Sequence, residues 1–262
     1  MMRSLMTAAS GMKAQQMQVD TIANNIANVN THGFKKSRLS FRSMLYQTLR
    51  EPGAPSAATQ TDATGLQIGT GVEIAGSVKQ FTPGELELTG NQMDLSIRGE
   101  GFFRVITPNG ETRYTRNGSF RQNVSGEIVT SEGYVLEGSP TIPADALGIS
   151  VGTDGTVSAS TRADQPPTPI GNIQLHRFPN PSGLKAQGGN YYTETASSGN
   201  SIASTGGLNG AGTIEQGMLE RSNVQTVDEL VSLIVAQRNY EVNSRAIKVS
   251  DDMLQQVNQL IR

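Results

Sequence analysis

Residues 5–29 read LMTAASGMKAQQMQVDTIANNIANV. Small and apolar side chains recur there at alternating spacings of three and four residues, and only Gln15 interrupts the series. The positions are Leu5, Ala8, Met12, Val19, Ile22, Ile26 and Val29. This is the heptad pattern of a coiled coil, and it predicts a helix with one apolar stripe. Gly33 then supplies a left-handed stop, so we expect an N-terminal helical segment over residues 1–33.

The C-terminal end repeats this period. Thr226 and Glu229 form a capping box, in which the hydroxyl holds the Glu229 amide and the carboxylate reaches back. Apolar residues then follow near heptad spacing, with Gln237, Ser244 and Asp251 as polar interruptions: Leu230, Leu233, Tyr240, Ile247, Leu254, Val257 and Ile261. Neither helix can bury its stripe alone. We therefore predict that a C-terminal segment over residues 216–262 completes one helical layer with the first helix or with neighbouring chains.

The predicted outer face of the N-terminal helix is rich in amides and poor in charge. Between Ser4 and Thr31 the only charged residues are Lys13 and Asp20, and the outward positions are Gln16, Gln18, Asn24, Asn25 and Asn28. Such a face suits contact with other protein, because amides form hydrogen bonds without the cost of desolvating a charge. An intramolecular coiled coil with an amide-rich exterior explains the same pattern equally well.

The middle of the chain predicts β-structure. Asn109-Gly110, Asn117-Gly118 and Asp154-Gly155 are hairpin signals between short alternating runs, so residues 76–215 are expected to form an antiparallel β body. Residues 34–75 are expected to form an extended arm and inner β linker, because 50–65 are rich in Pro, Ala, Ser and Thr. The predicted fold class is α+β: terminal coiled-coil helices in one layer, with an inserted arm and an all-β body.

Composition narrows the function classes. Only 35% of the residues are hydrophobic and 5% aromatic, which indicates an elongated chain or a core completed by partners. The net charge of −2 gives no attraction to nucleic acid or anionic membrane. No apolar run is long enough for membrane insertion, and the N-terminus lacks the apolar region of a cleaved signal. The absence of cysteine excludes disulfides and thiolate chemistry.

A search for reactive groups predicts no catalytic residue, no metal site and no cofactor. His32 and His176 occur in unlike contexts, and the chain has no zincin, EF-hand or nucleophile-elbow motif. The glycine-rich segment 65–71 lacks the Lys-Ser/Thr of a phosphate loop. Asp251 and Asp252 are adjacent on a helix and point apart, so they do not form an acid–base pair.

Two terminal motifs resemble a known family. Asn24-Asn-Ile-Ala-Asn28 and Thr31-His-Gly-Phe-Lys35 are similar to the N-terminal signature of the flagellar axial proteins, the rod, hook and junction subunits. Glu220-Arg-Ser-Asn-Val224, Gln237-Arg-Asn-Tyr-Glu-Val-Asn243 and Asp252-Met-Leu254 resemble the C-terminal signature. The length and the segments 45–53 and 65–71 resemble distal rod subunits.

The resemblance implies a structural subunit of the distal rod in the flagellar basal body, which crosses the periplasm. It implies export through the flagellar type III apparatus and polymerisation into a rigid helical tube that transmits motor torque to the hook. The implied partners are copies of itself, proximal rod and hook proteins at the two ends, and periplasmic and outer-membrane ring proteins. Subunit packing is assigned to Asn24, Asn25, Asn28, Gly33, Phe34, Lys35, Tyr46, Pro52, Gly53, Gly65, Asn223, Gln237, Tyr240, Asn243 and Leu254.

Three alternatives stay open at this point. The chain fits another flagellar axial protein, such as a proximal rod subunit. It also fits a secreted binding module on a coiled-coil stalk. A cell-wall hydrolase is the third alternative, although no catalytic group supports it. In the rod interpretation, the arm at 46–71 is expected to bridge adjacent subunits and to order only against neighbours, because ordering it costs backbone entropy.

Overall fold

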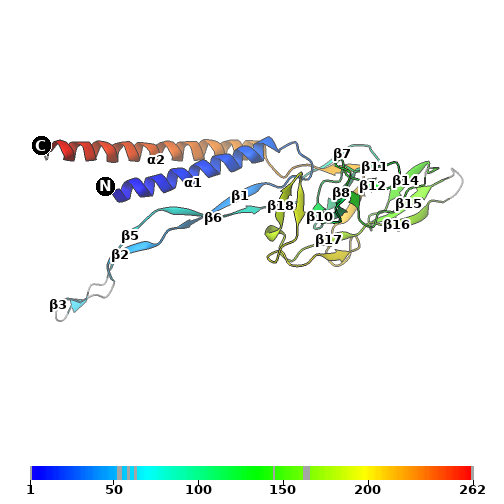
Figure 1. The fold of residues 1–262 in the computed structure, drawn as a ribbon, viewed down its shortest axis with the longest axis horizontal. Helices are drawn as coiled ribbons and strands as arrows, with labels where there is room; N and C mark the ends of the chain where they lie inside the picture. The colour runs from blue at the N-terminus through cyan, green and yellow to red at the C-terminus, as the bar shows by residue number, and fades with distance from the viewer. Residues whose placement is uncertain are drawn as a thin grey trace. The chain divides into compact units, whose positions relative to one another are not determined.

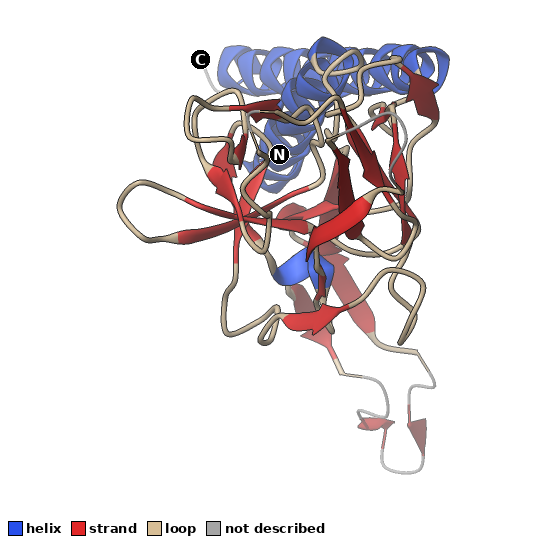
Figure 2. Cartoon of the chain, turned by 90° about the vertical axis from the view of Figure 1, so that its right-hand side faces the viewer, coloured by secondary structure: helices blue, strands red, loops and turns tan. Residues whose placement is uncertain are grey.

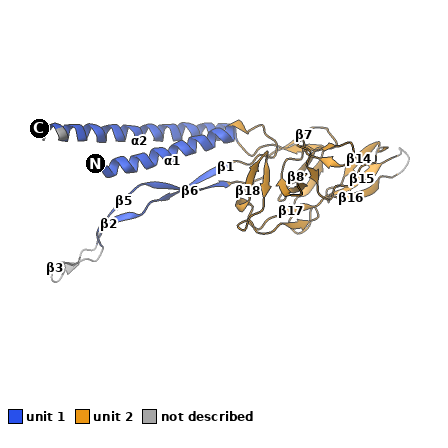
Figure 3. Cartoon of the chain, viewed as in Figure 1, with its two compact units in different colours: residues 1–26, 37–78, 225–262 blue, residues 27–36, 79–224 orange. Residues whose placement is uncertain are grey.

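Figure 1 shows the computed structural model, which describes residues 2–51, 55–57, 60–61, 64–143, 145–161 and 166–260. The chain divides into two compact units (Figure 3). Unit 1 contains Met1–Ile26, Ser37–Val78 and Gln225–Arg262, and unit 2 contains Ala27–Lys36 and Lys79–Val224. Residues 27–36 thus belong with the β body. The predicted boundary at 33 instead grouped residues 27–33 with the preceding helix.

Helices α1 (Met2–Ala27) and α2 (Thr226–Leu260) lie side by side and run in opposite directions (Figure 1). Near the start of α1, the hydroxyl of Ser4 lies 3.3 Å from that of Ser250. Near its end, the Asn25 amide donates to the Glu229 carboxylate at 3.2 Å. Two terminal helices and a strand-rich body are therefore present, which confirms the α+β class.

The apolar stripe of α1 was predicted correctly, and that of α2 only in part. Every predicted apolar position from Leu5 to Val29 is buried or half-buried. On α2, the predicted residues Leu233, Ile247 and Leu254 are half-buried, whereas Leu230, Tyr240 and Val257 are exposed. The buried side chains are instead Glu229, Ala236 and Ser250, which the predicted stripe did not include. The helices approach closely nearby, since a Cβ on Gly11 would lie 2.9 Å from the Asn243 amide nitrogen.

The predicted arm is a long two-stranded ribbon in unit 1 (Figure 1). Strand β1 (Ser37–Ser43) pairs with β6 (Val72–Lys79), and β2 (Tyr46–Arg50) pairs with β5 (Leu66–Gly69) in antiparallel register. Strands β3 (Pro55–Ala57) and β4 (Gln60–Thr61) pair farther along. Alternation of β-branched, aromatic and polar residues fits this pairing.

Two contacts fasten the ribbon to α1. Asn25 exchanges two hydrogen bonds with the backbone of Ser37, each 3.0 Å long. Farther out, Val72 donates its amide to the hydroxyl of Ser10 at 3.3 Å. Gly71 precedes it with a φ of +130°, and a Cβ there would overlap the Ser10 hydroxyl. Glycine is therefore required at this close approach.

Unit 2 is built from antiparallel strands (Figure 2). Among the described residues, seven strands form one sheet in the order β11-β12-β13-β9-β10-β19-β18. Their bounds are β9 (Phe103–Ile106), β10 (Thr112–Thr115), β11 (Arg121–Gln122), β12 (Ile128–Val129), β13 (Val135–Leu136), β18 (Lys185–Gly188) and β19 (Tyr191–Thr193). Hairpin connections dominate, and Asn109-Gly110 joins β9 to β10 as predicted, with a φ of +80° at Gly110. In contrast, β10 and β11, on either side of the predicted turn at Asn117-Gly118, do not pair with each other.

The remaining strands of unit 2 make smaller sheets. A three-stranded sheet joins β14 (Gly148–Val151), β15 (Thr156–Ser160) and β16 (Thr168–Asn172). Three pairs join β7 (Leu86–Leu88) to β22 (Met218–Glu220), β8 (Leu95–Arg98) to β21 (Thr213–Gln216), and β17 (Leu175–Arg177) to β20 (Ile202–Ser204). A 3₁₀ turn, η1, spans Pro181–Gly183. Residues 213–220 are therefore part of the body, because they pair with strands more than a hundred residues earlier.

Two clusters form the core of unit 2. Aliphatic side chains and Phe103 fill the first, where Val105, Val157 and Ile214 are fully buried. The second is aromatic and contains Phe102, Tyr114, Phe178, Leu184 and Tyr192. Its rings meet edge to face, the favoured geometry for aromatic pairs, with centroids such as those of Tyr114 and Phe178 at 4.8 Å. Most of the buried apolar side chains among the described residues therefore lie in unit 2.

His176 borders the aromatic cluster and is only 4% exposed. Its Nε2 lies 3.9 Å from the Glu137 carboxylate, which pairs with Arg104 at 2.7 Å. The pKa of His176 is lowered from 6.5 to about 4, mainly by burial; the Arg104 charge acts in the same direction and Glu194 opposes both. The imidazole is therefore neutral in the folded protein at neutral pH.

This burial predicts an acid-sensitive fold. Between pH 6.5 and 4 the unfolded chain binds a proton that the folded chain excludes, so the free energy of unfolding falls as the pH falls. The pKa shift corresponds to about 3 kcal/mol over that window. His176→Asn cannot titrate, and its unfolding free energy, measured in urea at several pH values, is expected to lose this part of the slope. An unchanged slope in the variant would contradict the assignment.

Candidate assembly surfaces and the buried charge cluster

Among the residues that the structure describes, no three His, Cys, Asp or Glu side chains gather as they would around a metal ion. In the same residues, no helix is long and apolar enough to cross a membrane. The features that stand out are exposed apolar surfaces in unit 1 and a buried cluster of charges in unit 2.

The first exposed surface lies on the ribbon. Leu45 is 90% exposed, and Tyr46 beside it is 59% exposed. Further exposed apolar residues along the same ribbon are Phe41, Met44, Leu49, Leu66 and Ile68. A two-stranded ribbon is marginal on its own in water, because it cannot cover an apolar face. This ribbon therefore has the composition of a contact surface.

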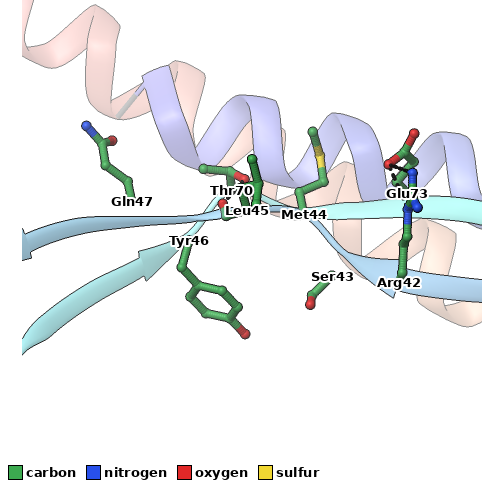
Figure 4. Close-up of a pocket in the computed structure, with 8 residues that line it drawn as sticks. All are labelled: Arg42, Ser43, Met44, Leu45, Tyr46, Gln47, Thr70 and Glu73. Atoms are coloured by element: carbon green, nitrogen blue, oxygen red, sulfur yellow. Dashed lines mark hydrogen bonds and ion pairs between the residues drawn. The ribbon is translucent and has the colours of Figure 1, made fainter.

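A pocket of about 730 Å³ opens where β1 passes into β2 (Figure 4). Met44, Leu45 and Tyr46 line it, and Tyr46 points to the opposite side of the ribbon from Met44. Arg42 and Glu73 form an exposed ion pair at 2.9 Å along the same wall. Since these charges neutralise each other, the pocket offers an apolar hollow with a polar border rather than a reactive group.

The second exposed surface is a stripe along α2. Val231, Val235, Val242, Val249 and Met253 are all exposed and recur at intervals of four and seven residues. That spacing keeps them on one face, which differs from the face carrying Ala236 and Ser250 by roughly 100° around the helix. A helix with two apolar faces has room for a second partner besides α1.

The predicted subunit-packing residues fall into three groups. Asn24, Tyr46, Gln237 and Tyr240 are exposed. Others are partly or wholly covered within the chain: Asn25, Asn28, Gly33, Phe34, Lys35, Gly65, Asn223, Asn243 and Leu254. Pro52 and Gly53 lie outside the described residues. Asn25 was expected to face outward; it is 2% exposed, because its amide binds Ser37 and Glu229.

The segment around Gly33 is docked inside unit 2. Gly33 has a φ of +69° and donates its amide to the Glu220 carbonyl at 2.8 Å. A Cβ at Gly33 would lie 2.5 Å from the backbone nitrogen of Asn117. Phe34 is buried beneath the Lys79 ammonium, which lies 5.0 Å from the ring centroid. The predicted left-handed conformation of Gly33 is thus correct, but α1 already ends at Ala27, so Gly33 permits a close backbone contact and does not stop the helix.

Lys35 leads into a buried charge cluster, which we define as Lys35, Arg116 and Glu220. Lys35 Nζ lies 2.6 Å from Oε1 of Glu220, and Arg116 Nε lies 2.9 Å from Oε2. The side chains of Lys35 and Glu220 are fully buried, and that of Arg116 is 2% exposed. Buried charges are retained only when they are paired and hydrogen-bonded, which this arrangement achieves.

Backbone groups complete the cluster. Two cations face one carboxylate, so the formal charge is +1, and carbonyl oxygens accept further hydrogen bonds from both cations. Lys35 donates to the Thr82 carbonyl at 2.7 Å, and Arg116 donates to the Gly99 carbonyl at 2.6 Å. Burial lowers the pKa of Lys35 to about 8, with Arg116 acting in the same direction and Glu220 opposing both.

Neutralising Glu220 is expected to destabilise unit 2 severely. Glu220→Gln keeps the shape but leaves two buried cations without a counter-charge, which costs about 3 to 5 kcal/mol of unfolding free energy. Glu73→Gln is the matched control, since its ion pair with Arg42 is exposed and contributes below about 1 kcal/mol. Denaturant unfolding of both variants measures the difference. Equal small losses would show that Glu220 is not essential to the cluster.

Comparison with known proteins identifies the class to which this architecture belongs. Three family models match the chain: "Flagella basal body rod protein" over residues 5–35, "Flagellar hook protein FlgE/F/G D1 domain" over 96–159, and "Flagellar basal body rod FlgEFG protein C-terminal" over 215–260. The first and third cover the two terminal motifs, and the second falls in the β body. The chain is thus an axial protein of the flagellar rod and hook class.

Full-length relatives are more specific. "Flagellar basal-body rod protein FlgG" of Borreliella burgdorferi is 44% identical over all of both chains. The FlgG of Buchnera aphidicola from Schizaphis graminum is 44% identical over 99% of this chain and all of its own. That of Bacillus subtilis is 42% identical over all of both. The chain belongs to the FlgG family of flagellar basal-body rod proteins.

Proposed function

We propose that this protein is a structural subunit of the distal rod of the flagellar basal body. Copies polymerise into a rigid helical tube that carries motor torque to the hook and so drives motility. The observation that carries the proposal is the exposed valine stripe of α2, because an apolar face left open beside a helix already paired with α1 needs a second protein surface.

The terminal helices supply the inner packing in this proposal. Helices α1 and α2 act as an antiparallel coiled coil within a subunit, and the α2 stripe meets a neighbouring copy. Asn24, Gln237 and Tyr240 are exposed beside these surfaces and are assigned to the same subunit packing, where amides pair without a charge penalty. A contact between two different faces of identical chains does not close, so it propagates as a helical filament.

The ribbon supplies a second contact. Its exposed residues Leu45 and Tyr46, together with the pocket beside them, bridge to an adjacent subunit and stiffen the tube. The predicted packing residue Gly65 belongs to this arm, as do Pro52 and Gly53 in the part not described. Burying apolar ribbon side chains gains about 25 cal/mol per Å² removed from water, which offsets the entropy lost when an arm is held.

The remaining assignments follow from the family. The protein is exported through the flagellar type III apparatus and meets proximal rod and hook proteins at its two ends and ring proteins around it. Its role is mechanical, with no enzymatic activity, cofactor, nucleic acid or membrane insertion. Another axial role, such as that of a proximal rod subunit, is the alternative. A relative named flagellar hook-basal body complex protein FlhP in Bacillus subtilis is 29% identical, below the 42% of the FlgG of the same organism.

The stripe of α2 gives a direct test. Val242→Asp places a carboxylate at its centre, and because Val242 is exposed, the monomer is expected to remain folded. Cells that carry only this variant should lose swimming in soft agar, and their purified basal bodies should lack the distal rod. Circular dichroism of the purified variant confirms that its helices persist.

Lys248→Asp is the matched control, since it adds a carboxylate at an exposed α2 position outside the stripe. Swimming should be retained in this variant. Normal rods in cells with Val242→Asp would show that the stripe is not an assembly surface.

A further inference from the structure

The chain passes between the two units four times. The passages lie after Ile26, Lys36, Val78 and Val224. At three of these passages, a short segment of unit 2 adjoins the boundary. These segments are residues 33–36, 79–84 and 220–224, and they lie far apart in the sequence.

Asn223 joins these three segments with one side chain. Its Oδ1 accepts the backbone N–H of Lys36 at 2.8 Å. Its Nδ2 donates to the Gln80 carbonyl at 2.8 Å and to the Thr82 hydroxyl at 2.9 Å. The carboxamide thus uses its oxygen and its nitrogen at the same time. Lys36 lies 187 positions from Asn223 in the sequence, and Gln80 lies 143 positions from it.

Further contacts close the same ring of segments. The Gln80 amide donates to the Lys36 carbonyl at 2.9 Å, and Lys79 Nζ donates to the Lys35 carbonyl at 3.3 Å. The buried Lys35–Glu220 pair fastens the first and third segments beneath Asn223. Hydrogen bonds that share partners in this way support one another, so loss of the central one loosens several.

We propose that Asn223 is a positioning residue that clamps residues 33–36, 79–84 and 220–224 into one stiff element of unit 2. A load that enters unit 2 along any of these segments is then shared by all three. This inference rests on the proposed function as a torque-bearing subunit, because only such a subunit carries load across these passages. A carboxamide is required at this position, since an aspartate would turn a carboxylate oxygen toward the Gln80 carbonyl and the Thr82 hydroxyl.

Hydrogen exchange of the full-length protein tests the clamp. In Asn223→Ala, the amides of Lys36 and Gln80 are expected to exchange at least about tenfold faster, while core amides such as Val105 keep their protection. Asn223→Asp keeps the acceptor for Lys36, so the Lys36 amide should stay protected while the Gln80 amide exchanges faster. Asn180→Ala is the control, because Asn180 makes an exposed bond to the Ser197 carbonyl away from the passages.

Two results in exchange would overturn the proposal. One is unchanged protection of both amides in Asn223→Ala. The other is an equal acceleration of Lys36, Gln80 and the core amides, which would mean that Asn223 only contributes to global stability.

Motility under load provides the functional measurement. Cells with Asn223→Ala should build rods but swim in viscous medium at less than about half the speed of cells with Asn180→Ala, with a smaller difference in dilute buffer. Equal speeds in viscous medium, or the absence of rods despite a folded monomer, would overturn the clamp. The proposed function fails differently: the unaltered chain would then be missing from purified rods, whatever the behaviour of Asn223.

Discussion

The fold of unit 2 depends on one carboxylate, that of Glu220, which holds two cations in a site closed to water. Lys35 and Arg116 approach it within 2.6 and 2.9 Å, and carbonyl groups of three further residues take their remaining donors. Either cation alone in this site would pay a desolvation cost of several kcal/mol. The pairing therefore requires that the segment after α1 and the segment before α2 fold together, which joins both ends of the chain to the β body.

This arrangement changes how the terminal motifs are understood. Residues that resemble an assembly signature, such as Gly33, Lys35 and Asn223, have their polar groups occupied inside unit 2. The exposed surfaces consist of other residues, mainly valines of α2 and the Leu45–Tyr46 region of the ribbon. Polar residues thus specify the subunit fold, where hydrogen-bond geometry gives uniqueness. The exposed apolar residues of α2 and the ribbon lie outside this network, where non-directional burial suits contacts that repeat along a polymer.

The sequence predicted what depends on local patterns and missed what depends on distant partners. The heptad spacing located α1 and α2, and the Asn-Gly and Asp-Gly signals anticipated an antiparallel body. The α2 stripe was predicted only in part, because the heptad pattern favours large residues such as Leu230 and Tyr240, which are exposed, whereas the small residues Ala236 and Ser250 are buried. The charge cluster had no local signal: Glu220 lies 185 positions from Lys35 and 104 from Arg116. Charge pairing at that separation can be recognised only after the chain is folded.

The placement of apolar residues also bears on when a subunit would polymerise. Unit 2 completes its own core and needs no neighbour for it. The ribbon is a two-stranded sheet, which is marginal alone, and its apolar side chains gain burial only against another protein surface. Exposed charged and amide residues of α2, such as Arg238, Asn239 and Arg245, lie between those valines and interrupt the apolar surface. In the proposed rod, the ribbon and the stripe are covered together, and a growing end that presents partners for both would cover them better than a second free subunit.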